Sequence, residues 1–285
     1  MGILGTFMCT PKEKARLREL AKKQVELANS PKNLERVELW KRHNSFKGER
    51  PVIHIEVGTF RKEIIDPMMQ CKSPFARMVE YNLLQNFVNF ELFDDDRVVP
   101  PYYMVNYLTE FELFGINVKE SVLTDENGTE LGHKFNHPIS DIHDDFDKFM
   151  QDSKIAVHKK TTMLHKKALE DIFGDILPVK LTMNSLYAVP TQQVVHFMGM
   201  ENMLFAMYDY PDEFKKMMDR IAEEYIKYFK FLENNDCLLQ NHEFEGLAQG
   251  SMCFWDEQPK QGRILTTDVW GFMAVSYTHL TLPTN

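Results

Sequence analysis

Short strand-like segments alternate with much longer helical segments along this chain of 285 residues. Apolar and β-branched residues favour strands at 52–57, 177–183 and 237–241, and more weakly at 97–100. This alternation predicts an α/β architecture with parallel strands. The Asn-Gly turn chemistry near residue 127 predicts a hairpin in addition. The helices are expected over these ranges: 11–29, 32–47, 75–93, 141–173, 191–207 and 211–235.

Polar and apolar residues alternate within the strands, so that each strand has one face of each kind. The polar faces of the first strand and of the 178–184 segment carry these residues: His54, Glu56, Lys180, Thr182 and Asn184. A doubly wound sheet has helices on both faces, and its strands are therefore apolar throughout. A parallel barrel has helices only outside and can be polar inside, near its mouth. The pattern therefore predicts an α/β protein with a (β/α)8 TIM barrel.

A concentration of polar groups follows the last predicted strand, in the segment CLLQNHEFEGLAQG at 237–250. The carboxyl ends of barrel strands carry the chemistry of such folds, so this segment is a candidate site. His242 directly follows the strand and titrates near neutrality, which makes it a candidate acid/base together with Glu56. The predicted ligand-binding residues are His54, Tyr103, Lys180, Asn184, Gln240, Asn241 and Glu243.

Structural roles compete with each of these assignments. The polar groups can form a barrel interior that hydrogen bonds and water satisfy, with no ligand. Glu56 can pair with Lys180, because a buried charge needs a partner in either case. His54 can be a satisfied core histidine, Asn184 a loop cap, and Tyr103 a packing aromatic.

Charge and composition restrict the partners that we expect. The net charge of −9 argues against a nucleic acid, because phosphate binding favours a basic surface. No segment is apolar enough to cross a bilayer, and the first residues do not resemble a secretory signal. Four widely spaced cysteines indicate reduced thiols and a cytoplasmic protein.

Residues 197–236, from FMGMEN through YDYPDEF to the end of the next helix, resemble the uroporphyrinogen decarboxylase superfamily. LWKRHNSFKGERPVIHIEV is similar to the opening helix and first strand of that superfamily. FGDILPVKLT and NHEFEGLAQGSMCFWDEQP resemble its corrinoid-associated branch. The resemblance covers about residues 30–273, and it too implies a (β/α)8 barrel.

The resemblance implies one of two chemistries. Decarboxylases of this superfamily bind substrate carboxylates through an Arg-Gln-Ala-Gly-Arg motif, where this chain has EVGTFRKE with Arg61 alone. Because that motif is missing, the resemblance implies the chemistry of the corrinoid-associated branch. A protein of this branch is a corrinoid-dependent methyltransferase, which moves a methyl group between a cobamide, carried by a small partner protein, and an acceptor. Tetrapyrrole decarboxylation is the alternative, and a non-catalytic corrinoid-binding or inactive truncated barrel is the third.

The same resemblance predicts the domain organisation and the metal content. Residues 1–48 would be a helical extension and 49–273 a partial barrel, while 274–285, AVSYTHLTLPTN, resemble a non-native tail. We therefore expect an N-terminal fragment of a longer protein. Members with thiol acceptors hold zinc through a His-x-Cys pair and a later cysteine. This chain has no His-x-Cys, so zinc is expected only in a full-length parent, with ligands outside this chain.

Overall fold

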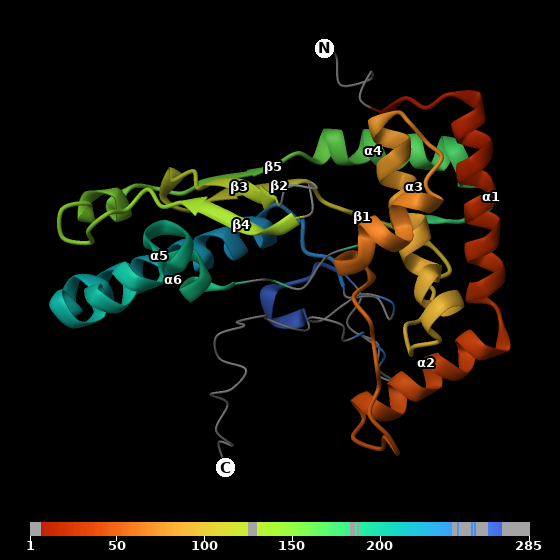
Figure 1. The fold of residues 1–285 in the computed structure, drawn as a ribbon, viewed down its shortest axis with the longest axis horizontal. Helices are drawn as coiled ribbons and strands as arrows, with labels where there is room; N and C mark the ends of the chain where they lie inside the picture. The colour runs from red at the N-terminus through yellow and green to blue at the C-terminus, as the bar shows by residue number, and fades with distance from the viewer. Residues whose placement is uncertain are drawn as a thin grey trace. The chain divides into compact units, whose positions relative to one another are not determined.

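The computed structural model describes residues 7–124, 130–182, 186, 188–240, 244, 252, 254 and 262–269 (Figure 1). The chain divides into two compact units, each assembled from segments that are distant in the sequence. Unit 1 comprises Met1–Leu108, His158–Ser185 and Leu238–Gly271. Unit 2 comprises Thr109–Val157, Leu186–Cys237 and Phe272–Asn285.

Three of the four α-helices of unit 1 begin where local sequence signals place them. Thr10 caps α1 and forms a capping box with Glu13, and α1 begins with a proline, as α2 and α3 also do. Ser30 caps α2, and Asn33 is buried and donates to the carbonyl groups of Ala28 and Val99. The predicted helices at 11–29, 32–47 and 75–93 are confirmed, the last continuing from α3 into the π-helical turn η5, Asn89–Phe93. The helices are α1 (Pro11–Ala28), α2 (Pro31–Asn44), α3 (Pro74–Val88) and α4 (Lys159–Phe173).

One parallel strand pair lies in unit 1, between β1 (Tyr103–Asn106) and β6 (Val179–Thr182). The prediction of a strand at 177–183 is confirmed, whereas the strand predicted at 97–100 is wrong, because β1 begins after the two prolines. Proline cannot donate to a ladder, and so the paired residues start beyond it. The apolar faces of the two strands join the core that contains helical residues such as Leu84 and Phe173.

The first predicted strand, 52–57, and the described part of the last, 237–240, form no ladder. The extended segment at 52–56 is instead held by carboxylates of the 94–97 segment. Asp96 accepts from the Ile53 amide at 2.8 Å, and Asp95 accepts from the Ile55 amide at 2.8 Å. Side-chain oxygens thus replace the carbonyl groups of a neighbouring strand, so the segment is extended without being a strand.

Unit 2 contains two antiparallel strand pairs. The strand β2 (Thr109–Glu112) pairs with β5 (Lys154–Val157). The predicted hairpin is confirmed as β3 (Lys119–Thr124) paired with β4 (Glu130–Asn136). The prediction of continuous helix over 141–173 is wrong in its first half, where the short helix η7 (Phe146–Met150) and β5 precede α4. Pairing with β2 outweighs the weak local helical signal there.

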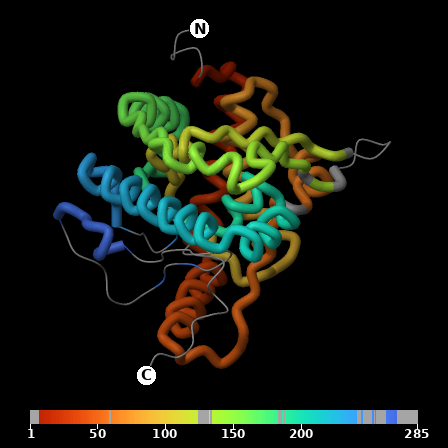
Figure 2. The backbone as a smooth tube through the Cα atoms, turned by 90° about the vertical axis from the view of Figure 1, so that its left-hand side faces the viewer, coloured from red at the N-terminus to blue at the C-terminus, as the bar shows by residue number. Residues whose placement is uncertain are grey.

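Two long helices complete unit 2, and they lie side by side in Figure 2. They are α5 (Pro190–Asp209) and α6 (Pro211–Asn234), which confirm the predictions at 191–207 and 211–235. The core between these helices and the strands includes Phe149, Phe197 and Ile221, all of them at most 1% exposed.

The described residues therefore form a mixed α/β structure that is mostly helical, with three two-stranded sheets. The α/β class is confirmed. Within these residues no closed barrel is present, since β1 and β6 pair only with each other. No helix in the described part of the chain is both long enough and apolar enough to cross a membrane.

Candidate functional site

The carboxyl ends of β1 and β6 bring two polar residues together in unit 1. Asn106 ends β1, Thr182 ends β6, and the two residues are paired in the parallel register. The Thr182 hydroxyl donates to Asn106 Oδ1 at 2.7 Å, and Thr182 is buried while Asn106 is exposed. Parallel sheets place ligands at this edge, so the pair marks a candidate site. Sequence reasoning missed Asn106, although the apolar run YYMV directly before it is a strand signal.

Lys180 lies on the polar face of β6, as the strand parity predicts. Its side chain is exposed, and its Nζ lies 4.3 Å from the centre of the Tyr102 ring, within cation–π range. Glu56 is also exposed and forms no ion pair with Lys180. The alternative in which these two charges pair is therefore wrong, and both side chains are exposed.

Tyr103 lies on the opposite, apolar face of β1. Its ring is buried against Phe173, with ring centres 5.5 Å apart, and its hydroxyl accepts from Asn82 Nδ2 at 3.0 Å. Burial raises the pKa of the Tyr103 hydroxyl to about 12, against the weaker opposing effect of Asn82. Tyr103 therefore packs against helices and does not join Lys180 on the polar face.

The side chains of His54 and Arg97 are in hydrogen-bonding contact in unit 1. The extended segment at 52–56 places the half-buried His54 with its Nε2 3.3 Å from Arg97 Nη1. A guanidinium group only donates, so His54 Nε2 accepts and carries no proton in this contact. Burial lowers the pKa of Arg97, while the negative charge of Asp95 and the nearby Tyr81 act to raise it.

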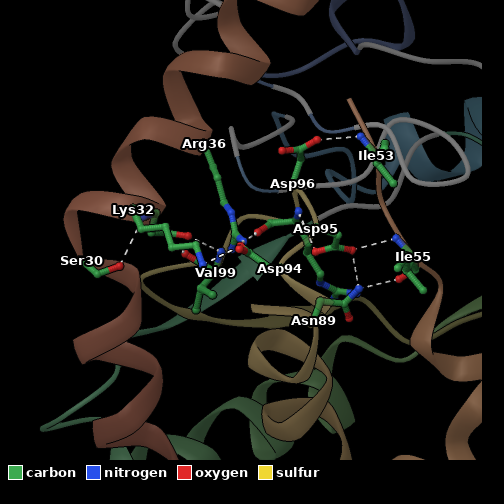
Figure 3. A network of polar contacts seen from close by, with 12 residues as sticks. Ser30, Lys32, Arg36, Ile53, Ile55, Asn89, Asp94, Asp95, Asp96 and Val99 are labelled. Carbon is green, nitrogen blue, oxygen red and sulfur yellow. Dashed lines mark hydrogen bonds and ion pairs between the residues drawn. The ribbon is translucent and has the colours of Figure 1, made fainter. Parts of the chain in front are cut away.

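Three successive aspartates position this contact, and Figure 3 shows their environment. Asp94 pairs with Arg36 at 2.8 Å and with Lys32. Asp95 accepts from the Asn89 amide group at 2.6 Å and from the backbone of Arg97 at 3.1 Å. These bonds fix the 94–97 backbone beside the extended segment (Figure 3).

Asp96 completes this arrangement through Arg50, whose guanidinium group donates two hydrogen bonds, at 2.6 and 2.7 Å. These bonds to Arg50 lower the pKa of Asp96, which keeps the carboxylate charged. The carboxylate network therefore holds both His54 and Arg97 in place.

A second arginine lies near the same part of unit 1. The guanidinium carbon of Arg61 is 4.5 Å from the centre of the Tyr81 ring, and the Gln85 amide group donates to the Tyr81 hydroxyl. Gly58 is close to this hydroxyl, since a Cβ at Gly58 would lie 3.6 Å from it. The segment after residue 56 thus brings Arg61 against Tyr81 of α3.

The polar segment that follows Leu239 is only partly described. Gln240 is half-buried. The other predicted site residues Asn184, Asn241, His242 and Glu243 lie outside the described residues. Among the residues that are described, no group of three or more His, Cys, Asp and Glu side chains is arranged to hold a metal ion.

Comparisons with known proteins identify no relative of this chain. No family model, curated protein or solved structure matches the chain. The local sequence resemblance and the geometry of unit 1 are therefore the grounds for any functional proposal.

Proposed function

We propose that this chain belongs to a corrinoid-dependent methyltransferase of the uroporphyrinogen decarboxylase type. In this proposal a separate small protein carries the cobamide, and its methyl group moves to or from an acceptor at the polar face of β1 and β6. The proposal includes the (β/α)8 barrel fold, which requires further strands beside the β1–β6 pair.

The observation that carries the proposal is that the only parallel strand pair in the described residues, β1 with β6, has one apolar face and one polar face. On one face, Tyr103, Val105 and Val179 pack into a core that also contains residues of α1, α3 and α4. On the other face, Lys180 and Thr182 are polar. A parallel strand with helices on one face only is typical of a barrel wall. Polar groups on the inner face can orient a ligand.

Residues 54 and 56 of the same unit add groups suited to acid/base work. His54 is held with an unprotonated Nε2, and Glu56 is an exposed carboxylate. Glu56 and His242 are the proposed acid/base pair.

Incubation of the full chain with methylcobalamin tests the proposal, with the absorption spectrum of the cobalt as the readout. We expect demethylation that depends on an added acceptor. Glu56→Gln should reduce the rate, whereas Glu110→Gln, an exposed carboxylate of unit 2, should not. Binding of methylcobalamin without demethylation would favour a non-catalytic corrinoid-binding protein instead, and absence of both would contradict the proposal.

One observation favours tetrapyrrole decarboxylation as the second candidate. The EVGTFRKE segment offers only Arg61, but Arg97 adds a second guanidinium group near Tyr81. Two arginines can bind the carboxylates of an acidic substrate. Turnover of uroporphyrinogen with release of carbon dioxide, in the absence of any cobamide, would support this candidate over the first.

A further inference from the structure

Arg97 differs from the other arginines in its part of unit 1, because no carboxylate of the described residues forms an ion pair or hydrogen bond with its guanidinium group, although the charge of Asp95 acts on it from a greater distance. Arg36 pairs with Asp94, and Arg50 pairs with Asp96. The side chain of the intervening Asp95 accepts from backbone and amide groups instead. In the described part of the chain, the only hydrogen-bonding contact of the Arg97 guanidinium group is His54 Nε2, at 3.3 Å.

This arrangement is costly for a positive charge unless an anion reaches it. A guanidinium group has five N–H donors and does not lose its proton in proteins. His54 Nε2 accepts one of them. A partly buried cation that no carboxylate contacts directly is costly for the fold, and proteins therefore pair such groups. The residue is half-buried rather than enclosed, so a ligand can approach it.

We infer that Arg97 binds a carboxylate or phosphate group of a ligand. The planar fork of a guanidinium group matches both kinds of oxyanion through two parallel hydrogen bonds. The contact with His54 and the bond from the Arg97 backbone to Asp95 hold the fork in place before the ligand arrives. This inference deepens the proposed function and rests on it, since it names the substrate class of the same site.

Titration of the full chain with inorganic phosphate and, separately, with acetate tests this inference. The readout is the nitrogen-15 signal of the Arg97 Nε, measured without any cobamide. We expect a saturable shift with at least one anion. A shift with phosphate alone indicates a phosphate-bearing ligand, and a shift with acetate alone indicates a carboxylate. If neither anion shifts the signal, the inference is overturned.

Two variants of Arg97 and one control sharpen the test. Arg97→Gln should weaken the affinity for the anion at least about tenfold, and Arg97→Lys should weaken it less, because lysine keeps the charge but loses the fork. Arg18→Gln removes the same charge from a guanidinium group that already pairs with Asp175, and it should leave the affinity unchanged.

Unchanged affinity in both Arg97 variants would overturn the inference. If Arg97→Gln does not fold, the test uses the affinity of Arg97→Lys for the anion instead, and an affinity equal to that of the wild-type chain overturns the inference. Because no cobamide is present, failed methyl transfer with intact anion binding would count against the proposed function alone.

Discussion

Neighbouring residues of the same type have different roles in unit 1, and their burial explains why. Asp94 has an exposed carboxylate, with 67% of its side chain accessible, although it pairs with Lys32 and Arg36. Asp95 is 5% exposed and accepts from three donors. Exposed ion pairs contribute little to stability, whereas a buried acceptor that is lost leaves its donors unsatisfied.

The substitution Asp95→Asn should therefore lower the free energy of unfolding by about 1–3 kcal/mol, because the amide group would face at least one N–H donor. The Ile55 amide should also exchange its hydrogen faster. Denaturant unfolding and hydrogen exchange measure these effects.

Asp94→Asn is the matched control. Asparagine tolerates the left-handed backbone of this residue, which has a φ of 52°, and we expect a loss of at most about 1 kcal/mol. Equal losses in the two variants would contradict the role of burial.

At the scale of elements, α5 shows how a single glycine shapes a helix. Gly199 has a φ of 77° and a ψ of 161° and kinks α5. The carbonyl groups just before the kink find other partners. His196 accepts from His137 Nδ1 at 2.9 Å, and Phe197 accepts from the Ile139 amide at 3.0 Å. Because a carbonyl oxygen only accepts, His137 carries its proton on Nδ1. Gly199, the glycine of the FMGMEN segment, thus allows residues 137–139, which follow β4, to form hydrogen bonds with α5.

Gly199→Ala should destabilise unit 2 by about 1–3 kcal/mol, because this backbone conformation is nearly exclusive to glycine. An added Cβ would also lie 3.3 Å from the His137 ring, which would have to move. Thermal and denaturant unfolding measure the loss.

Gly58→Ala provides the comparison. A Cβ at Gly58 meets its nearest neighbour at an ordinary 3.6 Å, and we expect a change within about 0.5 kcal/mol. A Gly199→Ala variant as stable as this control would show that the kink is not required.

At the scale of the whole molecule, the two largest cores belong to different units. One core contains residues of α1, α3 and α4 with β1 and β6, and the other contains residues of α5 and α6. Among the described residues, each of these cores draws only on its own unit. We therefore expect the units to respond separately to core substitutions.

Phe149→Ala should destabilise unit 2 by about 3–5 kcal/mol and Leu84→Ala should destabilise unit 1 by about 2–5 kcal/mol, because both side chains are fully buried. Hydrogen exchange should accelerate mainly in α5 and α6 for the first variant, and in α1 and α3 for the second. Equal acceleration of both units in either variant would indicate a single cooperative structure.

Local signals in the sequence were sufficient for most helices and for the hairpin. Proline and a capping residue at the first turn place α1 and α2, and the turn chemistry near residue 127 predicts the β3–β4 pair. These interactions join residues that are close along the chain, so a short stretch of sequence contains the whole signal. The α/β class followed from the alternation of strand-like and helical segments along the chain.

Only the tertiary structure decided where strands pair and which side chains meet. The segment at 52–56 has a strand-like sequence, but Asp95 and Asp96 supply its acceptors, and the paired strand begins later, at Tyr103. The contact of His54 with Arg97 joins residues 43 positions apart, and no local pattern reports it. The physical reason is that strand pairing and buried charges depend on partners distant in the sequence, whereas helices satisfy their own backbone within a few residues.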